Sequence, residues 1–152
     1  MYKYKTSVFI DGFNLYYGSL KNTDLKWLNL ESFCDKLLPK NDVTDIYYFT
    51  ACVKPRSGDD QVHIRQQTYL RALRTLPRIK IIYGSFQTSV KAMPLAYPRK
   101  GASRFVEVIK TEEKGSDVNL ATWLLIKAYE DAFETAVVVT NDSDLESPIL
   151  YV

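Results

Sequence analysis

Four aspartates stand at positions from which their carboxylates could share a metal ion: Asp11, Asp117, Asp142 and Asp144. Carboxylates placed close together repel one another and raise one another's pKa unless a cation neutralises them. Oxygen ligands favour Mg²⁺ or Mn²⁺ over zinc, and a lone His63 with two separated cysteines supplies no tetrahedral nitrogen and sulfur set. The chemistry expected of these residues is therefore that of a hard divalent cation.

The elements around these aspartates predict that they meet in space. Asp11 ends the apolar run 6–11, and Asp142 follows the buried-strand pattern of residues 136–140. The carboxyl ends of parallel strands lie at one edge of a sheet. Asp117 falls in the first turn of a helix that we expect Ser116 to cap and that runs back along the sheet from this edge. The sequence thus predicts one acidic cluster at that edge.

The rest of the chain alternates between strand and helix patterns. Residues 45–53 and 79–86 are rich in aromatic and β-branched residues and predict strands, whereas the apolar spacing in 30–38 and 60–76 predicts helices. Segment 89–104 contains Pro94, Pro98 and Gly101 and is expected to be an exposed loop, followed by an edge strand at 105–109. This order predicts an α/β fold with a parallel sheet covered on both faces, in a single domain spanning residues 1–152.

Three motifs carry a resemblance to a known family. They are Phe9-Ile-Asp-Gly-Phe-Asn-Leu-Tyr-Tyr17, Glu113-Lys-Gly-Ser-Asp-Val-Asn119 and Val138-Val-Thr-Asn-Asp-Ser-Asp144. In this order they resemble the NYN family of PIN-like nucleases. The resemblance implies a three-layer α/β/α, Rossmann-like fold with a mostly parallel sheet, dependence on Mg²⁺ or Mn²⁺, and hydrolysis of RNA phosphodiester bonds. It also implies that the four aspartates are metal ligands and that Asn14 and Lys114 join them in catalysis.

Each of these residues also has a purely structural interpretation. Asp11 could simply end a strand, Asp117 could favour the helix dipole, and Asn14 could cap a helix. Asp142 or Asp144 could stabilise a turn, and Lys114 could be an ordinary solvated lysine. Capping needs alone do not explain why four carboxylates fall at the same end of one sheet, so the combination favours a site.

The charges are unevenly distributed along the chain. Residues 54–110 contain twelve Lys or Arg and three Asp or Glu, although the net charge of the whole chain is only +2. A cationic region beside an acidic metal site suits RNA, although the same charges could lie on scattered solvated faces. The candidate backbone-binding residues are Lys54, Arg56, Arg65, Arg71, Arg74, Arg78, Lys91, Arg99, Lys100 and Arg104. Tyr97, in the expected loop, is the best candidate for stacking on a base.

Several other classes of protein are not supported. No apolar run approaches the roughly 20 residues that span a bilayer, and the charged first residues do not form a signal peptide, so a cytoplasmic location without membrane contact is expected. Cys34 and Cys52 lie in apolar stretches and are expected to be reduced core residues. No glycine-rich phosphate-binding loop follows the first strand, which argues against dinucleotide or motor chemistry.

The end of the chain leaves alternatives open. The sequence stops at Val152, eight residues after Asp144, earlier than the resemblance leads one to expect. A fragment, a degenerate copy and a protomer of a homo-oligomer all fit this ending. Accordingly, the first functional hypothesis is a metal-dependent ribonuclease, and the second is an RNA-binding or regulatory module without strong catalysis. A phosphatase for small esters is the third.

Overall fold

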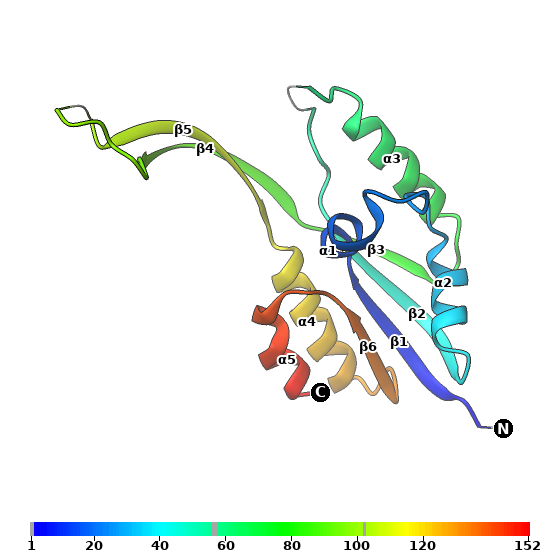
Figure 1. Ribbon diagram of the computed structural model, residues 1–152. Helices are drawn as coiled ribbons and strands as arrows, with labels where there is room; N and C mark the ends of the chain where they lie inside the picture. The colour runs from blue at the N-terminus through cyan, green and yellow to red at the C-terminus, as the bar shows by residue number, and fades with distance from the viewer. Residues whose placement is uncertain (1, 56–57, 102) are drawn as a thin grey trace.

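A four-stranded parallel sheet forms the centre of the computed structural model, which describes residues 2–55, 58–101 and 103–152 (Figure 1). The strand order is β3-β2-β1-β6. The strands are β1 (Tyr4–Asp11), β2 (Asn41–Thr50), β3 (Ile79–Tyr83) and β6 (Thr135–Val139). β1 pairs with a strand on each side, and all six of its residues from Thr6 to Asp11 are buried, as expected for a central strand without solvent on either face.

Helices cover both faces of this sheet, so the predicted three-layer α/β/α fold is confirmed. The two faces of β1 alternate: Val8 and Ile10 belong to one core and Phe9 to the other. The first core is closed by α1 (Gly12–Leu15), the π-helical turn η1 (Tyr16–Leu20), α2 (Leu30–Leu37) and α3 (Val62–Leu73). The second is closed by α4 (Ser116–Tyr129) and the 3₁₀ turn η2 (Ser143–Leu145), and α5 (Glu146–Leu150) follows η2 and packs against α4.

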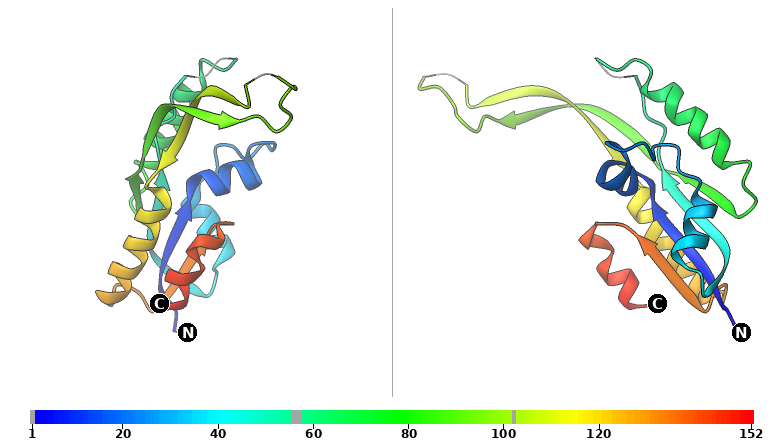
Figure 2. Two further views of the ribbon diagram at one scale, coloured as in Figure 1. Left: turned by 90° about the vertical axis from the view of Figure 1, so that its left-hand side faces the viewer. Right: turned by 45° about the vertical axis from the view of Figure 1, so that its right-hand side comes forward.

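A long antiparallel hairpin projects from the carboxyl edge of the sheet (Figures 1 and 2). It consists of β4 (Ser85–Pro94) and β5 (Phe105–Lys114), which pair along their whole length. The expectation of a loop throughout 89–104 is therefore wrong for residues 89–94. Most of the side chains of this ribbon are exposed on both faces, so its sequence needs no apolar alternation, and the strand signal is weak.

The junction between β5 and α4 differs in detail from the prediction. Ser116 is the first residue of α4 instead of its cap, and Gly115 takes the cap position with φ +96°, a left-handed conformation that glycine adopts readily. The Glu113 carboxylate accepts hydrogen bonds from the Ser116 backbone N–H (3.1 Å) and hydroxyl (2.8 Å). A side chain from the preceding strand therefore does the capping that we had expected of Ser116.

Two further expectations concern the cysteines and the membrane. Cys34 is buried in the first core, but Cys52 is exposed and accepts a hydrogen bond from Gln67 at 3.3 Å, so the expectation that both are core residues is wrong for Cys52. Cys52 follows β2 and lies between the buried residues Ala51 and Val53, so it is the intervening residue of an alternating pattern whose other members are buried. In the described ranges, none of the helices is long and apolar enough to cross a membrane.

Candidate active site

Asp11 lies at the carboxyl end of the central strand and is held by donors from three directions. Only 3% of the residue is exposed. Its Oδ1 accepts a hydrogen bond from the Asn14 backbone N–H at 3.0 Å, which caps α1. Its Oδ2 accepts from the Asn14 side-chain amide and from the Thr140 hydroxyl, the latter at 3.3 Å. These contacts orient a charged group that would otherwise be costly to bury.

Thr140 connects Asp11 to Asp142. Its hydroxyl donates to Asp11 and accepts a hydrogen bond from the Asp142 backbone N–H at 3.0 Å. Asp142 in turn caps η2, because its Oδ1 accepts from the Asp144 backbone N–H at 2.9 Å. The ends of β1 and β6 are neighbours in the sheet, and this threonine fixes their two carboxylates relative to each other.

Removing the Thr140 hydroxyl should therefore loosen the site without removing a carboxylate. We expect Thr140→Val, which keeps the shape of the side chain, to lower stability by about 1 kcal/mol because Asp11 loses one donor. Any activity that depends on Asp11 should fall by roughly tenfold, while Thr140→Ser should retain most of it. Urea unfolding and initial rates measure the two effects; equal rates for the Val and Ser variants would rule out a positioning role.

Asp11 and Asp142 open onto one cavity of about 350 Å³, which we call the acidic cavity. Its polar lining residues are Asp11, Asn14, Glu113, Ser116, Asp117 and Asp142, and its aromatic ones are Phe13, Tyr17 and Phe86. The lining thus comes from β1, α1, η1, the base of the hairpin, the first turn of α4 and the residues after β6. Four carboxylates without a lysine or arginine among them make this cavity strongly negative.

The charge of the acidic cavity acts most clearly on Asp117. This residue is exposed as a whole, but its carboxyl lines the cavity. Partial burial, followed by the negative charges of Asp11 and Asp142, raises the pKa of the Asp117 carboxyl, and Glu113 and Asp144 act in the same direction. Ionised Asp117 is therefore destabilised by its surroundings, which is the electrostatic condition that favours a bound cation.

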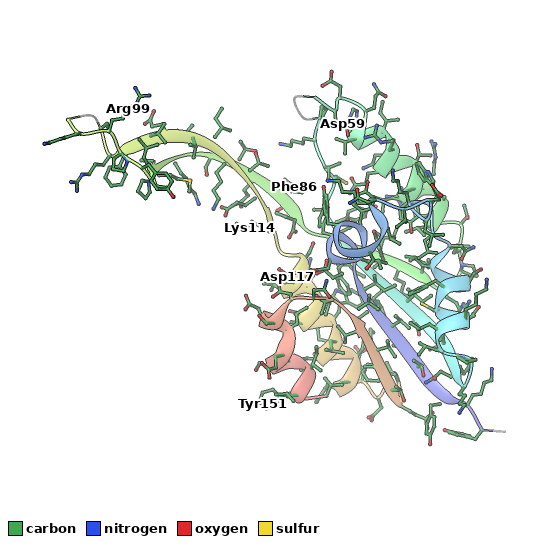
Figure 3. All side chains as sticks on the ribbon, viewed as in Figure 1. Asp59, Phe86, Arg99, Lys114, Asp117 and Tyr151 are labelled. Atoms are coloured by element: carbon green, nitrogen blue, oxygen red, sulfur yellow. The ribbon has the colours of Figure 1, made fainter. Side chains whose placement is uncertain are left out.

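The structure brings some of the predicted residues together and leaves others at the margin. Asp11, Asn14, Asp117 and Asp142 line the acidic cavity. Asp144 is exposed and lies outside the lining, although its charge reaches Asp117. Lys114 is also outside the lining; it stands at the base of the hairpin, and its Nζ lies 3.7 Å from a Glu112 carboxylate oxygen (Figure 3).

The donor set of the acidic cavity fits a metal ion in its chemistry more than in its geometry. Within residues 2–55, 58–101 and 103–152, no three His, Cys, Asp or Glu side chains are arranged so that they could hold an ion between them. The chemistry of the lining nevertheless suits a hard cation, since the groups in it that are charged at neutral pH are all carboxylates, and partial burial together with their mutual repulsion raises the pKa of Asp117. Mg²⁺ retains several waters and needs only one or two direct carboxylate ligands, so the remaining carboxylates could act through water.

The candidate cations for nucleic-acid binding differ in whether another side chain already engages them. Arg78 pairs with Asp35, at 2.8 Å, and with Glu31; Arg65 pairs with Asp59, Lys91 pairs with Glu112 at 3.1 Å, and Arg74 donates to the Tyr83 hydroxyl. Lys54 and Arg71 are exposed and form no ion pair with any described residue. Arg56 lies outside the described residues. At the far end of the hairpin, Arg99, Lys100 and Arg104 also form no ion pair with any described residue, and Figure 3 shows Arg99 well away from Asp117. Tyr97, also in the turn of the hairpin, is 94% exposed.

Two residues of the site were missed by reasoning from the sequence. Glu113 brings a fourth carboxylate into the acidic cavity, and Thr140 joins two strand ends. Both lie inside the motifs 113–119 and 138–144, so their positions were marked. The motifs did not indicate their roles, because the sequence pattern predicts a solvated strand residue at Glu113 and the end of a buried strand at Thr140.

The fold and the acidic cavity define an α/β domain with a cluster of carboxylates at the carboxyl edge of its sheet, and comparison with known proteins places it in a family. The sequence model of the NYN domain matches residues 5–152, and the chain belongs to the NYN domain family. It is 37% identical over 171 residues to the 6-hydroxy-3-succinoylpyridine 3-monooxygenase HspA of Pseudomonas putida (strain DSM 28022 / S16). That alignment covers 93% of this chain and 53% of the relative, so the chain spans about half the length of that protein. No solved structure matches.

Proposed function

We propose that this NYN domain is a ribonuclease that hydrolyses RNA phosphodiester bonds with Mg²⁺ or Mn²⁺. The observation that carries the proposal is the convergence of Asp11, Asp117 and Asp142 on the acidic cavity, where partial burial and the charges of Asp11 and Asp142 raise the pKa of Asp117. A site of this kind is unfavourable for the protein without a cation, and a divalent ion bound by carboxylates is the common means of cleaving phosphodiesters.

The roles proposed for the side chains follow from their positions. A bound ion would hold a phosphate oxygen, lower the pKa of a water molecule and stabilise the leaving oxyanion. Asp11, oriented by Asn14 and Thr140, is proposed as the central ligand because its carboxylate is the most rigidly held. Asp117 and Asp142 would bind the ion directly or through water, and Glu113 and Asp144 would supply further negative charge around it. Lys114 is proposed to contact a phosphate at the rim.

The hairpin is proposed to hold the RNA strand. Its end carries Arg99, Lys100 and Arg104 without competing ion pairs to described residues, and Tyr97 offers a ring for stacking. Each phosphate neutralised by such a cation releases counterions and strengthens binding at low salt. The hairpin leaves the body next to the acidic cavity, since Phe86 and Glu113 at its base line that cavity.

Removing the charges at the end of the hairpin should weaken RNA binding in a salt-dependent manner. For Arg99→Ala/Lys100→Ala/Arg104→Ala, the slope of log affinity against log salt should fall by about 2, at ~0.7 per lost contact with a single strand. Fluorescence anisotropy with a labelled single-stranded RNA measures this slope. Lys3→Ala/Lys36→Ala/Lys40→Ala removes the same charge from exposed positions near the other end of the sheet and is the matched control. Equal slopes for the two triple variants would contradict a role for the hairpin.

The direct test of the proposed function uses the purified chain and labelled RNA. We expect cleavage products in Mg²⁺ or Mn²⁺ and none in EDTA, with a small phosphate ester left unchanged. Unchanged RNA in a folded preparation that still binds RNA would overturn the nuclease proposal in favour of an RNA-binding module. Hydrolysis of the ester alone would indicate a phosphatase.

The relative's name supports a second candidate, oxygenation of a small aromatic heterocycle. The observation that favours it is the 37% identity over nearly the whole chain to a protein named as a monooxygenase of 6-hydroxy-3-succinoylpyridine. Since this chain spans about half of that protein, the comparison does not transfer the complete activity. Consumption of 6-hydroxy-3-succinoylpyridine under oxygen with an added electron donor, without cleavage of RNA, would favour this candidate over the ribonuclease.

A further inference from the structure

A second cavity, separate from the acidic one, lies between the helices of the first core and the carboxyl end of β2. Its volume is about 110 Å³, comparable with the roughly 150 Å³ cavity that accepts a benzene ring. We call it the aromatic cavity after six of its lining residues, Phe13, Tyr16, Tyr17, Trp27, Tyr48 and Tyr69. Its size and its walls suit one planar ring of about six atoms.

Tyr48 places an unused polar group at this cavity. The residue is 94% buried, yet its hydroxyl makes no hydrogen bond to any residue that the structure describes. The neighbouring Tyr69 hydroxyl, in contrast, donates to the Leu28 carbonyl at 2.8 Å. Burial raises the pKa of Tyr48, so its hydroxyl stays protonated and can donate. A hydroxyl that donates to no described group is free to donate to a polar ring atom in the cavity that it lines.

Gly12 lets the hydroxyl end of Tyr48 pack closely against the backbone at the start of α1. A Cβ at position 12 would lie 2.7 Å from the Tyr48 hydroxyl oxygen and 2.7 Å from the Phe49 carbonyl oxygen. Gly12 also follows Asp11 directly, so the residue that carries the central carboxylate and the residue that borders the aromatic cavity are adjacent in the chain. This short segment therefore fixes the positions of the two cavities relative to each other.

The aromatic residues shared by the two cavities and the cationic residues of the aromatic cavity favour a nucleotide as its ligand. Phe13 and Tyr17 line both cavities, with their rings stacked at 6.3 Å between centroids. Lys26 and Arg65 are exposed lining residues of the aromatic cavity; Arg65 is paired with Asp59, whereas Lys26 forms no ion pair with any described residue and brings positive charge to the cavity. An aromatic site with cations, next to a site that attracts divalent metal, matches a base together with its phosphates.

We infer that the aromatic cavity binds one unstacked pyrimidine base of the RNA strand, next to the phosphate that is held at the acidic cavity. The base would lie among the rings, and a carbonyl oxygen of the pyrimidine would accept a hydrogen bond from the Tyr48 hydroxyl. A monocyclic base fits the volume better than a purine. The inference rests on the proposed function for the identity of the strand, and it adds to it a preference for the base beside the cleaved bond.

Binding can be measured without catalysis, because Trp27 lines the aromatic cavity and Trp123 packs on Tyr47 in the other core. In a Trp123→Phe background with EDTA, uridine 5′-monophosphate should change the Trp27 fluorescence saturably and bind more tightly than adenosine 5′-monophosphate. Val62→Phe, which fills the cavity from α3, should weaken uridine 5′-monophosphate by about tenfold. Ile64→Phe, on an exposed position of the same helix outside the lining, should bind like the parent.

Tyr48→Phe separates the hydroxyl from the packing of the ring and should weaken the nucleotide by about fivefold without altering the melting temperature. Unchanged binding in both Val62→Phe and Tyr48→Phe, or saturable binding of pyridine-3-carboxylate in place of the nucleotide, would overturn the inference.

Failure of the proposed function would give a different set of results from failure of this inference. If uridine 5′-monophosphate binds as expected but RNA is not cleaved, the base-binding role of the aromatic cavity is supported and the nuclease proposal is contradicted. If Val62→Phe cleaves RNA with the same base preference as the parent, the nuclease proposal is supported and base binding in the aromatic cavity is contradicted.

Discussion

Asp11→Asn should lower metal-dependent RNA cleavage by about 100- to 1000-fold, the largest effect expected of any single change in this protein. The charge is lost from the most buried and most firmly oriented carboxylate of the acidic cavity. Cleavage of labelled RNA in Mg²⁺ at saturating protein concentration measures this loss. Titration with Mn²⁺ should show a parallel weakening of metal binding.

The same substitution should also destabilise the fold. The Asp11 carboxylate receives hydrogen bonds from the Asn14 backbone, the Asn14 amide and the Thr140 hydroxyl, and an asparagine has only one oxygen to accept them. We expect a loss of about 1–3 kcal/mol in urea unfolding, since a donor is left facing an NH₂ group. Rates must therefore be measured where the variant is fully folded.

Asp42→Asn provides the matched control. Asp42 is exposed on β2, opposite Lys5 of β1, near the amino end of the strands and far from the acidic cavity. This variant should keep both the activity and the stability of the parent. Retention of metal-dependent cleavage in folded Asp11→Asn would exclude Asp11 from the chemistry.

Asp117→Asn should abolish most of the activity and yet raise the melting temperature of the metal-free protein at pH 7. Partial burial and the neighbouring carboxylates raise the pKa of Asp117 above its ordinary value, so the folded protein binds this proton more tightly than the unfolded chain does. Folding stability is consequently lost as the pH rises through the raised pKa. Asparagine avoids that loss, and the two melting temperatures should converge as the pH falls below it.

Added metal should reverse the order of the melting temperatures of the parent and Asp117→Asn. In Mg²⁺ the parent should gain stability because a cation neutralises the carboxylates, whereas Asp117→Asn should gain little. Differential scanning fluorimetry in EDTA and in Mg²⁺, between pH 4 and pH 8, measures both effects. A lower melting temperature for Asp117→Asn in EDTA at pH 7 would contradict the repulsion that we assign to the acidic cavity.

Glu31→Gln distinguishes the repulsion expected at Asp117 from the effect of a helix dipole on an acidic residue. Glu31 occupies the first turn of α2, as Asp117 does in α4, but it accepts a hydrogen bond from the Arg78 backbone at 2.8 Å and pairs with the Arg78 guanidinium at 3.6 Å. A carboxylate at the start of a helix normally stabilises it. Glu31→Gln should therefore lower the melting temperature. The opposite sign at Asp117 would show that its neighbours outweigh the dipole.

These predictions share one physical basis, which is the contrast between two kinds of carboxylate in one cavity. Asp11 is buried and supplied with donors, so it is positioned before any ligand arrives. Asp117 is exposed and faces like charges, so a cation gains most by binding near it. A site that combines a fixed ligand with a destabilised one is suited to bind an ion and to exchange its waters.

The parallel α/β fold and the location of the strand-end aspartates were predictable from the order of the residues alone. Buried parallel strands are continuous apolar runs, as in residues 6–10 and 136–140, and the residue that follows such a run must lie at the carboxyl edge of the sheet. Asp11 and Asp142 were predictable on this ground. The motifs around them were also sufficient to predict the family, which the match over residues 5–152 shows.

Which polar groups line the same cavity depends on the packing of distant segments and could not be predicted locally. The length of the β4–β5 hairpin depends on pairing across 20 residues whose two faces both meet solvent, so no local pattern marks it. Glu113 enters the acidic cavity, and Asp144 stays outside it, because of the turn at Gly115 and the cap at Asp142, whose geometry follows from contacts between distant segments. The aromatic cavity likewise exists only where α1, β2 and α3 meet. Strand periodicity is a local property of the chain, whereas the direction of a side chain at a strand end is set by the packing of its neighbours.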